Sequence, residues 1–183
     1  MKEPDWRHCS PQELWEYVAW HLAKQGFDTV LVGGAVVSIY SEGIYQSGDL
    51  DFVLMNYEEL PKKVLAEIGF KPSGKSFFHP ECKHLFIEFV SAPLGIGDDL
   101  KIRPREHKID GQKIKILNPS DCVRDRLASY IYFKARECLD QAVLVASRHK
   151  INLSIIRKWC ESEGNAETYQ TFISLLRKEK KAT

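Results

Sequence analysis

The sequence predicts an α+β fold, in which a mixed β-sheet with flanking helices is followed by a C-terminal helical bundle. Short β-branched runs between turn residues, typical of strands, dominate residues 1–118. From residue 119 onward the apolar residues recur at helical spacing. The 183 residues, 44% of them hydrophobic, suit one domain or one domain with a small helical extension. We therefore expect a core over residues 1–118 and a helical region over residues 119–183.

The first predicted element is a helix over residues 10–26. Ser10 is suited to the N-cap and Pro11 to the first helical position, and Glu13 follows the serine by three residues, which completes a capping box. Gly26 ends the helix.

A strand, a short helix and a second strand are expected next. TVLVGG at residues 29–34 is a β-branched run that ends in Gly33 and Gly34. Residues 35–43 are expected to form a helix, because the chain must cross back after the glycines. DLDFVLM at residues 49–55 then forms a strand whose Leu50, Phe52 and Leu54 face the core.

The remaining elements of the sheet region follow from local signals. A helix is expected over residues 57–70, with an early proline, and strands over residues 70–80 and 84–91. The pair Asp110-Gly111 is a strong turn signal, so residues 105–117 are predicted to form a hairpin. Three or four helices should then begin at about Pro119.

Composition and charge limit the class of protein. Five cysteines are scattered without a CxxC pair, which fits a reducing compartment. The N-terminal residues are too polar for a signal peptide, and no apolar run approaches the ~18 residues of a membrane span. We expect a cytoplasmic protein without a membrane partner. Residues 1–60 hold three Lys or Arg against ten Asp or Glu, whereas residues 127–183 hold ten against six.

Asp49 and Asp51 are the first candidate site residues. Alternate residues of a strand point to the same face, about 6.6 Å apart along the chain. Two neighbouring carboxylates repel each other, and a divalent cation allows both to stay ionised. Mg²⁺, or Mn²⁺, is the expected cofactor, because magnesium binds through one or two carboxylates together with substrate phosphates.

Gly33 and Gly34 are the second feature, because they stand where a strand turns into a helix. Without side chains they let a phosphate approach the N–H groups at the helix N-terminus. Together the two features predict that the glycines seat a nucleoside triphosphate while the aspartates hold its metal.

These residues resemble the nucleotidyltransferase superfamily related to DNA polymerase β. The resemblance rests on Gly33-Gly34, on the segment Ser47-Gly48-Asp49-Leu50-Asp51-Phe52 and on Glu88 in a later apolar strand, and it covers roughly residues 28–92. The helical tail is similar to that of small bacterial and archaeal members, including abortive-infection-type nucleotidyltransferases.

The resemblance implies a role for each residue. Residues 1–118 would form a nucleotidyltransferase-like core in which Asp49, Asp51 and Glu88 bind the metals. Glu88 would also act as base on the acceptor hydroxyl, the glycines would contact phosphate, and Ser47 matches a Thr or Ser common two residues before the first acid. Two positions depart from the family pattern: Tyr45 stands where many members carry Arg, and the third acid is Glu88 where relatives often have Asp.

Two further groups have alternative interpretations. Arg126 and Lys134 are candidate nucleotide-binding cations, or else they pair with acids of the same helices. His79, Cys82 and His84 lie close together in the sequence and are candidate zinc ligands. No fourth ligand has the spacing of a known zinc finger, which favours a partly exposed turn instead.

The predicted function is transfer of a nucleoside monophosphate from a nucleoside triphosphate to a hydroxyl acceptor, with release of pyrophosphate. The acceptor remains open between RNA, a protein and a small molecule, and the oligomeric state is also open. Two alternatives remain: a non-catalytic nucleotide-binding or regulatory module of the same fold, and an interaction domain with a vestigial site.

Overall fold

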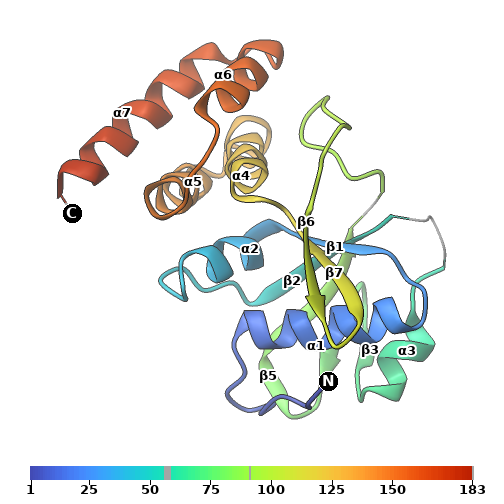
Figure 1. Cartoon of the computed structure of the whole chain (residues 1–183). Coiled ribbons are helices and arrows are strands. Elements are labelled where there is room, and N and C mark those ends of the chain that lie inside the picture. Colours follow the sequence, from blue (N-terminus) through green and yellow to red (C-terminus); the bar gives the residue numbers. More distant parts are fainter. Residues whose placement is uncertain (56–58, 91, 183) are drawn as a thin grey trace.

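The structure, a computed structural model, describes residues 1–55, 59–90 and 92–182 (Figure 1). The chain forms a seven-stranded mixed sheet and then a run of four helices, as the sequence predicts. The elements follow in the order α1 (Pro11–Lys24), β1 (Thr29–Val32), α2 (Gly33–Tyr40), β2 (Asp49–Leu54), α3 (Lys62–Glu67), β3 (Lys71–Ser73), β4 (Ser76–His79), β5 (Cys82–Val90), β6 (Arg105–Ile109), β7 (Gln112–Ile116), α4 (Pro119–Phe133), α5 (Arg136–Arg148), α6 (Leu153–Ser162) and α7 (Ala166–Ala182).

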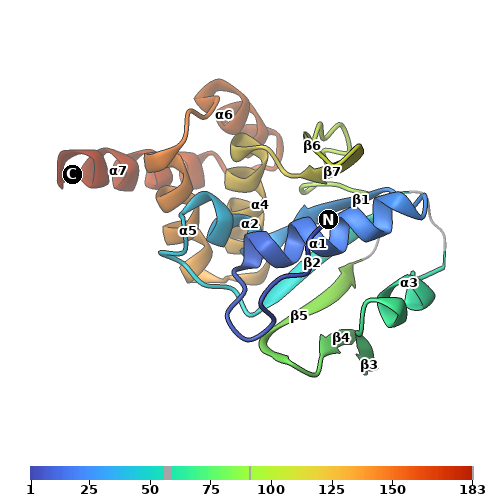
Figure 2. The ribbon, with the colours of Figure 1, turned by 60° about the horizontal axis from the view of Figure 1, so that its bottom comes forward.

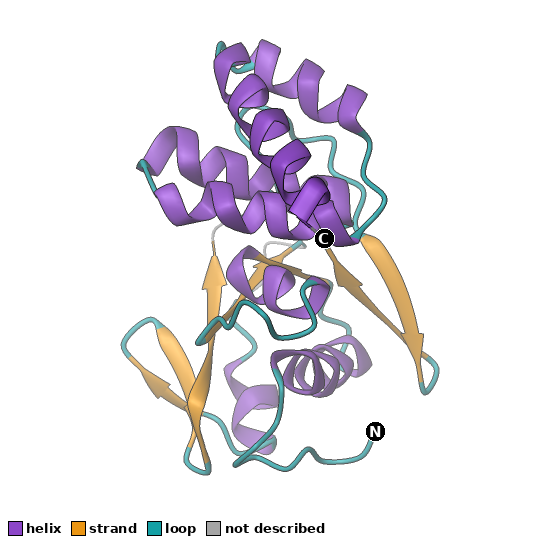
Figure 3. Ribbon diagram, turned by 90° about the vertical axis from the view of Figure 1, so that its left-hand side faces the viewer, coloured by secondary structure: helices purple, strands orange, loops and turns teal. Residues whose placement is uncertain are grey.

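The strands lie in the order β3-β4-β5-β2-β1-β7-β6. β1 pairs antiparallel with β2, while β2 runs parallel to β5 and β1 runs parallel to β7. The hairpins β3–β4 and β6–β7 therefore form the two opposite edges of the sheet (Figure 3). Asp49 and Asp51 lie on one strand and Glu88 on the adjacent strand, which confirms that part of the predicted fold.

The N-terminal helices cover one face of the sheet. α1 packs on β1 and β7, and α2 packs on β1 and β2, as Figure 2 shows. The capping box of α1 is present, since Ser10 Oγ accepts from the Glu13 N–H at 3.2 Å and Glu13 Oε2 accepts from the Ser10 N–H at 2.8 Å. Leu50 and Phe52 are fully buried beneath these helices, as their alternation with the aspartates predicts.

The C-terminal helices gather at one end of the molecule (Figure 3). α4 and α5 pack on each other and on α2, while α6 and α7 pack on α4 and α5, respectively. The buried side chains form one continuous cluster that includes Phe52 of the sheet and Phe172 of α7. The predicted division between residues 118 and 119 falls where α4 begins, and we retain it as a proposal. Among the described residues no helix is both long enough and apolar enough to cross a membrane.

Two predicted elements were wrong in extent. The helix expected over residues 57–70 spans only Lys62–Glu67; its first two predicted residues, 57 and 58, lie outside the described part of the chain. Pro61 occupies the N-cap, because a proline without an N–H fits before the first turn and not inside a helix. The single strand expected over residues 70–80 is the hairpin β3–β4, turned by Gly74 at φ +60°.

A buried ion pair anchors the segment between β5 and β6 to the helical bundle. Arg124 of α4 is 4% exposed and donates to Asp121 Oδ1 at 2.5 Å and to Asp99 Oδ2 at 2.6 Å. Asp121 is itself buried and also accepts from Asn118 Nδ2 at 2.7 Å. Removing the guanidinium would leave a buried carboxylate without its charged partner.

We expect Arg124→Met to lower the free energy of unfolding by about 3–5 kcal/mol, the usual cost of breaking a buried pair from one side. The control is Arg157→Met, which removes an exposed pair with Glu161 on α6 and should cost less than about 0.5 kcal/mol. Urea denaturation of both variants measures the difference. Equal losses would show that burial does not set the strength of the Arg124 pairs.

Candidate active site

The parallel pairing of β2 with β5 brings three carboxylates to one face of the sheet. Asp51 stands opposite Glu88 in the register, and paired strands lie about 4.8 Å apart. Asp49 precedes Asp51 by two residues and points to the same face, because side chains alternate along a strand. All three acids are half-buried.

A serine holds each of the two outer acids. Ser47 Oγ donates to Asp49 Oδ1 at 2.6 Å, and Ser76 Oγ donates to Glu88 Oε1 at 2.6 Å. Ser76 is the registered partner of Glu88 across the antiparallel pair β4–β5. Each bond engages one of the two oxygens of its carboxylate.

Both glycines of the turn are required by close approach of these side chains. Gly33 has φ +74°, and a Cβ built on it would lie 2.4 Å from Asp51 Oδ2. A Cβ on Gly34 would lie 2.7 Å from Ser47 Oγ. Val32 is the N-cap of α2, and its side chain has no atom that could accept a bond from the first N–H groups of the helix. The turn thus places Asp51 close to the N-terminus of α2. The first N–H groups of this helix have no side-chain cap, so they could bind an anion.

Burial and neighbouring charges raise the pKa of Asp51 to about 6. Burial is the largest cause, followed by the negative charges of Asp49 and Glu88. Arg126 of α4 opposes the shift, whereas Asp125 adds to it. Among the described residues, the charged groups that shift the pKa of Asp51 are therefore three acids and one cation.

The structure places the two predicted cations differently. Arg126 is largely buried and donates to Asp125 Oδ2 at 2.6 and 3.0 Å, which is the acid pairing that the sequence left as an alternative. Its charge nevertheless reaches Asp51. Lys134 is exposed at the left-handed C-cap of α4 and lines a cavity of about 420 Å³ together with residues of α5 and α7. The nucleotide-binding roles of both residues stay predictions.

A cavity of about 650 Å³ is lined by residues 44 and 45 together with residues of α5 and α7. Its lining includes Tyr45, Gln141 and Leu144. Tyr45 places its hydroxyl 3.4 Å from where a Cβ on Gly34 would lie, and Gln141 Oε1 accepts from Arg126 at 3.4 Å. Two lining residues of the cavity, Tyr45 and Gln141, thus also lie near Gly34 and Arg126, respectively.

The three acids supply carboxylate oxygens on one face of the sheet, and such oxygens are the donor type that magnesium prefers. Within the described part of the chain, Asp49, Asp51 and Glu88 do not bring three ligand oxygens within 4.8 Å of one another, so by themselves they do not form a closed metal site. Magnesium usually binds to one or two carboxylates and completes its shell with water and phosphate oxygens.

Sequence reasoning missed Ser76 as a partner of Glu88. The sequence signal for this contact was the turn at Gly74 between β3 and β4. The hairpin that this turn forms sets the register that places Ser76 opposite Glu88. With that strand read as one continuous element, the contact could not be found.

The seven-stranded sheet, the glycine turn and the adjacent acids define a nucleotidyltransferase-like fold. No model of a known protein family matches the sequence, and no curated protein matches it. The solved structures that resemble it include an antigenic nucleotidyltransferase-like protein from Paracoccidioides brasiliensis, at 14% identity and a TM-score of 0.59, over 94% of this chain and 89% of that one. They also include ANT(2″)-Ia in complex with adenylyl-2″-tobramycin, at 9% identity and a TM-score of 0.49, over 91% of this chain and 96% of that one.

We expect Gly33→Ala to destabilise the protein more than Gly43→Ala. Gly43 has φ +81° and nothing within 4 Å of a built Cβ, so alanine there meets backbone strain alone, about 1–2 kcal/mol. At Gly33 the clash with Asp51 adds to the same backbone strain. We expect the clash to cost about 1–3 kcal/mol more, which is the usual cost of overpacking a protein core. Urea denaturation of the two variants measures the clash by difference, and equal losses would contradict the close approach.

We expect Asp51→Asn to stabilise the metal-free protein at neutral pH. A carboxyl whose folded pKa lies near 6 instead of 3.8 contributes stability below pH 3.8 that is lost as the pH rises through 6. The asparagine variant should therefore exceed the parent by up to about 3 kcal/mol at pH 7.5 and by less than about 1 kcal/mol at pH 4. Denaturation at both pH values in a chelator measures this, with Glu67→Gln, an exposed acid of α3, as control. A pH-independent difference would contradict the raised pKa.

Proposed function

We propose that this protein is a metal-dependent nucleotidyltransferase. It moves a nucleoside monophosphate from a nucleoside triphosphate to a hydroxyl of an acceptor, which is RNA, a protein or a small molecule, and releases pyrophosphate. The observation that carries the proposal is the parallel register of β2 and β5, which sets Glu88 beside Asp51 next to the N-terminus of α2. The fold shared with a nucleotidyltransferase-like protein supports it.

Asp49, Asp51 and Glu88 would hold Mg²⁺ or Mn²⁺. When bound, the metal supplies positive charge that neutralises the phosphates and the developing charge of the leaving oxygen. The first N–H groups of α2 bind phosphate oxygens, because they have no side-chain acceptor and carry the positive end of the helix dipole. Arg126 adds positive charge near Asp51, whose pKa it lowers.

Glu88 is the base in this proposal. Its Oε1 is held by Ser76, so Oε2 is free to accept the proton of the acceptor hydroxyl. The acceptor oxygen forms a bond to the α-phosphorus while the bond from that phosphorus to the pyrophosphate oxygen breaks. The cavity beside Tyr45 and Gln141 offers room next to this reaction for the nucleoside or the acceptor.

We expect variants of the acids to separate nucleotide binding from transfer. Asp49→Asn and Asp51→Asn should abolish magnesium-dependent nucleotide binding, since these acids hold the metal that accompanies the triphosphate, yet leave the protein folded. Glu88→Gln should keep most of the binding and lose transfer by about 10²–10⁴-fold, the usual effect of losing a general base. Thermal shifts with the four triphosphates and Mg²⁺ or Mn²⁺ measure binding, because a bound ligand raises the melting temperature.

Transfer is measured with radiolabelled triphosphates on RNA pools and on the protein itself, with Glu67→Gln as the variant that should change neither property. An active parent whose Glu88→Gln variant transfers at the same rate would remove Glu88 from the mechanism. Nucleotide binding without transfer to any acceptor would instead support the non-catalytic nucleotide-binding module, and no magnesium-dependent binding would support an interaction domain.

A further inference from the structure

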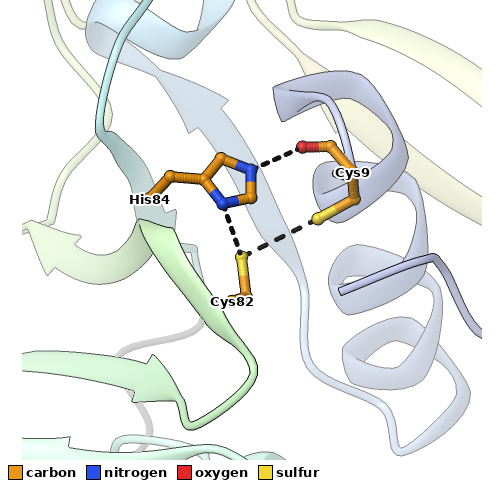
Figure 4. A group of neighbouring side chains, drawn as sticks. All are labelled: Cys9, Cys82 and His84. Atoms are coloured by element: carbon orange, nitrogen blue, oxygen red, sulfur yellow. Dashed lines mark hydrogen bonds between the residues drawn. The ribbon is translucent and has the colours of Figure 1, made fainter. Parts of the chain in front are cut away.

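A second group of potential metal ligands lies at the far end of β5 from Glu88. Cys82 is the first residue of β5 and His84 follows on the same strand, while Cys9 comes from the segment before α1. Within the described residues these three alone among His, Cys, Asp and Glu form a trio whose ligand atoms all lie within 4.8 Å of one another (Figure 4). Six residues of strand, about 20 Å, separate Cys82 from Glu88, so the group is independent of the candidate active site.

The separations match those of a tetrahedral zinc centre. Cys9 Sγ lies 3.7 Å from Cys82 Sγ, and Cys82 Sγ lies 3.9 Å from His84 Nδ1. With Zn–S bonds of about 2.3 Å and Zn–N bonds of about 2.0 Å, tetrahedral angles put two sulfurs about 3.8 Å apart and a sulfur and a nitrogen about 3.5 Å apart. These two separations therefore lie within a few tenths of an ångström of the tetrahedral values, and all three ligand atoms lie within 4.8 Å of one another.

The imidazole of His84 is oriented as a ligand. Its Nε2 lies 2.9 Å from the backbone oxygen of Cys9, as Figure 4 shows. A carbonyl oxygen only accepts, so Nε2 carries the hydrogen and Nδ1 of the neutral ring presents its lone pair toward Cys82. Metal-binding histidines are commonly held in this way, by donating the second ring N–H to a carbonyl.

Charge and access also suit a cation. Cys9 and Cys82 are buried, whereas His84 is exposed. His84 lines an open cavity of about 660 Å³ together with Arg7, Glu81 and Lys83, which gives an ion and a water ligand a way in. Two thiolates and a neutral imidazole around a divalent cation carry no net charge, so the centre can stay largely buried without an unpaired charge.

We propose that Cys9, Cys82 and His84 bind Zn²⁺, with water as the fourth ligand. Two thiolates and an imidazole are a ligand set typical of zinc, and ligation by Cys9 and Cys82 releases their two thiol protons. The sequence grouped His79 with Cys82 and His84 but favoured a partly exposed turn over a zinc site. In the structure the His79 ring stacks on Trp6 with centroids 3.8 Å apart, and Cys9 joins Cys82 and His84 instead. The zinc ion would fasten the N-terminal segment to the β4–β5 hairpin beside that stacked pair.

The test measures zinc directly on the reduced full-length protein. The protein is stripped with a chelator, kept reduced and titrated with Zn²⁺ against a chromophoric chelator, and Co²⁺ reports thiolate ligation through its sulfur-to-metal charge-transfer band. We expect one ion per chain and a higher melting temperature with Zn²⁺. His84→Ala removes an exposed side chain, so it should fold normally, and it should weaken zinc binding by at least about 10–100-fold.

The matched control is His8→Ala, which removes an exposed histidine next to Cys9 whose ring bonds to Asp5 instead. It should bind zinc as the parent does, and Cys82→Ser should lose the cobalt charge-transfer band. Less than one zinc per chain in the parent, or equal losses in His8→Ala and His84→Ala, would overturn the proposal. A Cys9–Cys82 disulfide in the air-exposed protein, combined with no zinc binding after reduction, would also overturn it in favour of a redox-active thiol pair.

Discussion

The parallel pairing of β2 with β5 is the constraint on which the candidate site depends. Asp49 and Asp51 lie two residues apart on β2. Glu88 lies near them only because β5 runs beside β2 with Glu88 in register with Asp51. Side chains alternate along a strand, so a slip of one residue would turn Glu88 to the opposite face. The same slip would bury the wrong side of β5, where Leu85 and Ile87 belong to the core. Core packing thus fixes the geometry of the acids.

The local parts of this arrangement could be predicted from the sequence, and the long-range parts could not. The capping box, the glycine turn and the Asp-x-Asp strand are each contained within a few residues, where spacing translates directly into geometry. Glu88 was found through resemblance to a known family. Ser76 could not be recognised as the partner of Glu88, because the hairpin that sets its register was read as one strand. Cys9 could not be recognised as the partner of Cys82, because the two lie 73 residues apart and no local pattern links them.

The buried charges around Arg124 and those around Asp51 are balanced in different ways. Arg124 is enclosed by Asp121 and Asp99, so its ion pairs are internally complete and hold a connecting segment in place. Around Asp51 the balance is different, because Asp49, Glu88 and Asp125 outnumber Arg126, whose own guanidinium is shared with Asp125. A folded protein retains such an excess of negative charge at a cost in stability, and a bound cation relieves it.

The contact between Gly33 and Asp51 has an evolutionary consequence. The missing Cβ and the carboxylate occupy the same volume, so the effect of a substitution at either position depends on the residue at the other. A side chain at position 33 is easier to accommodate once the acid at position 51 has been shortened or has moved. The effects of substitutions at positions 33 and 51 are therefore not additive. A single substitution at Gly33 is disfavoured as long as Asp51 is retained.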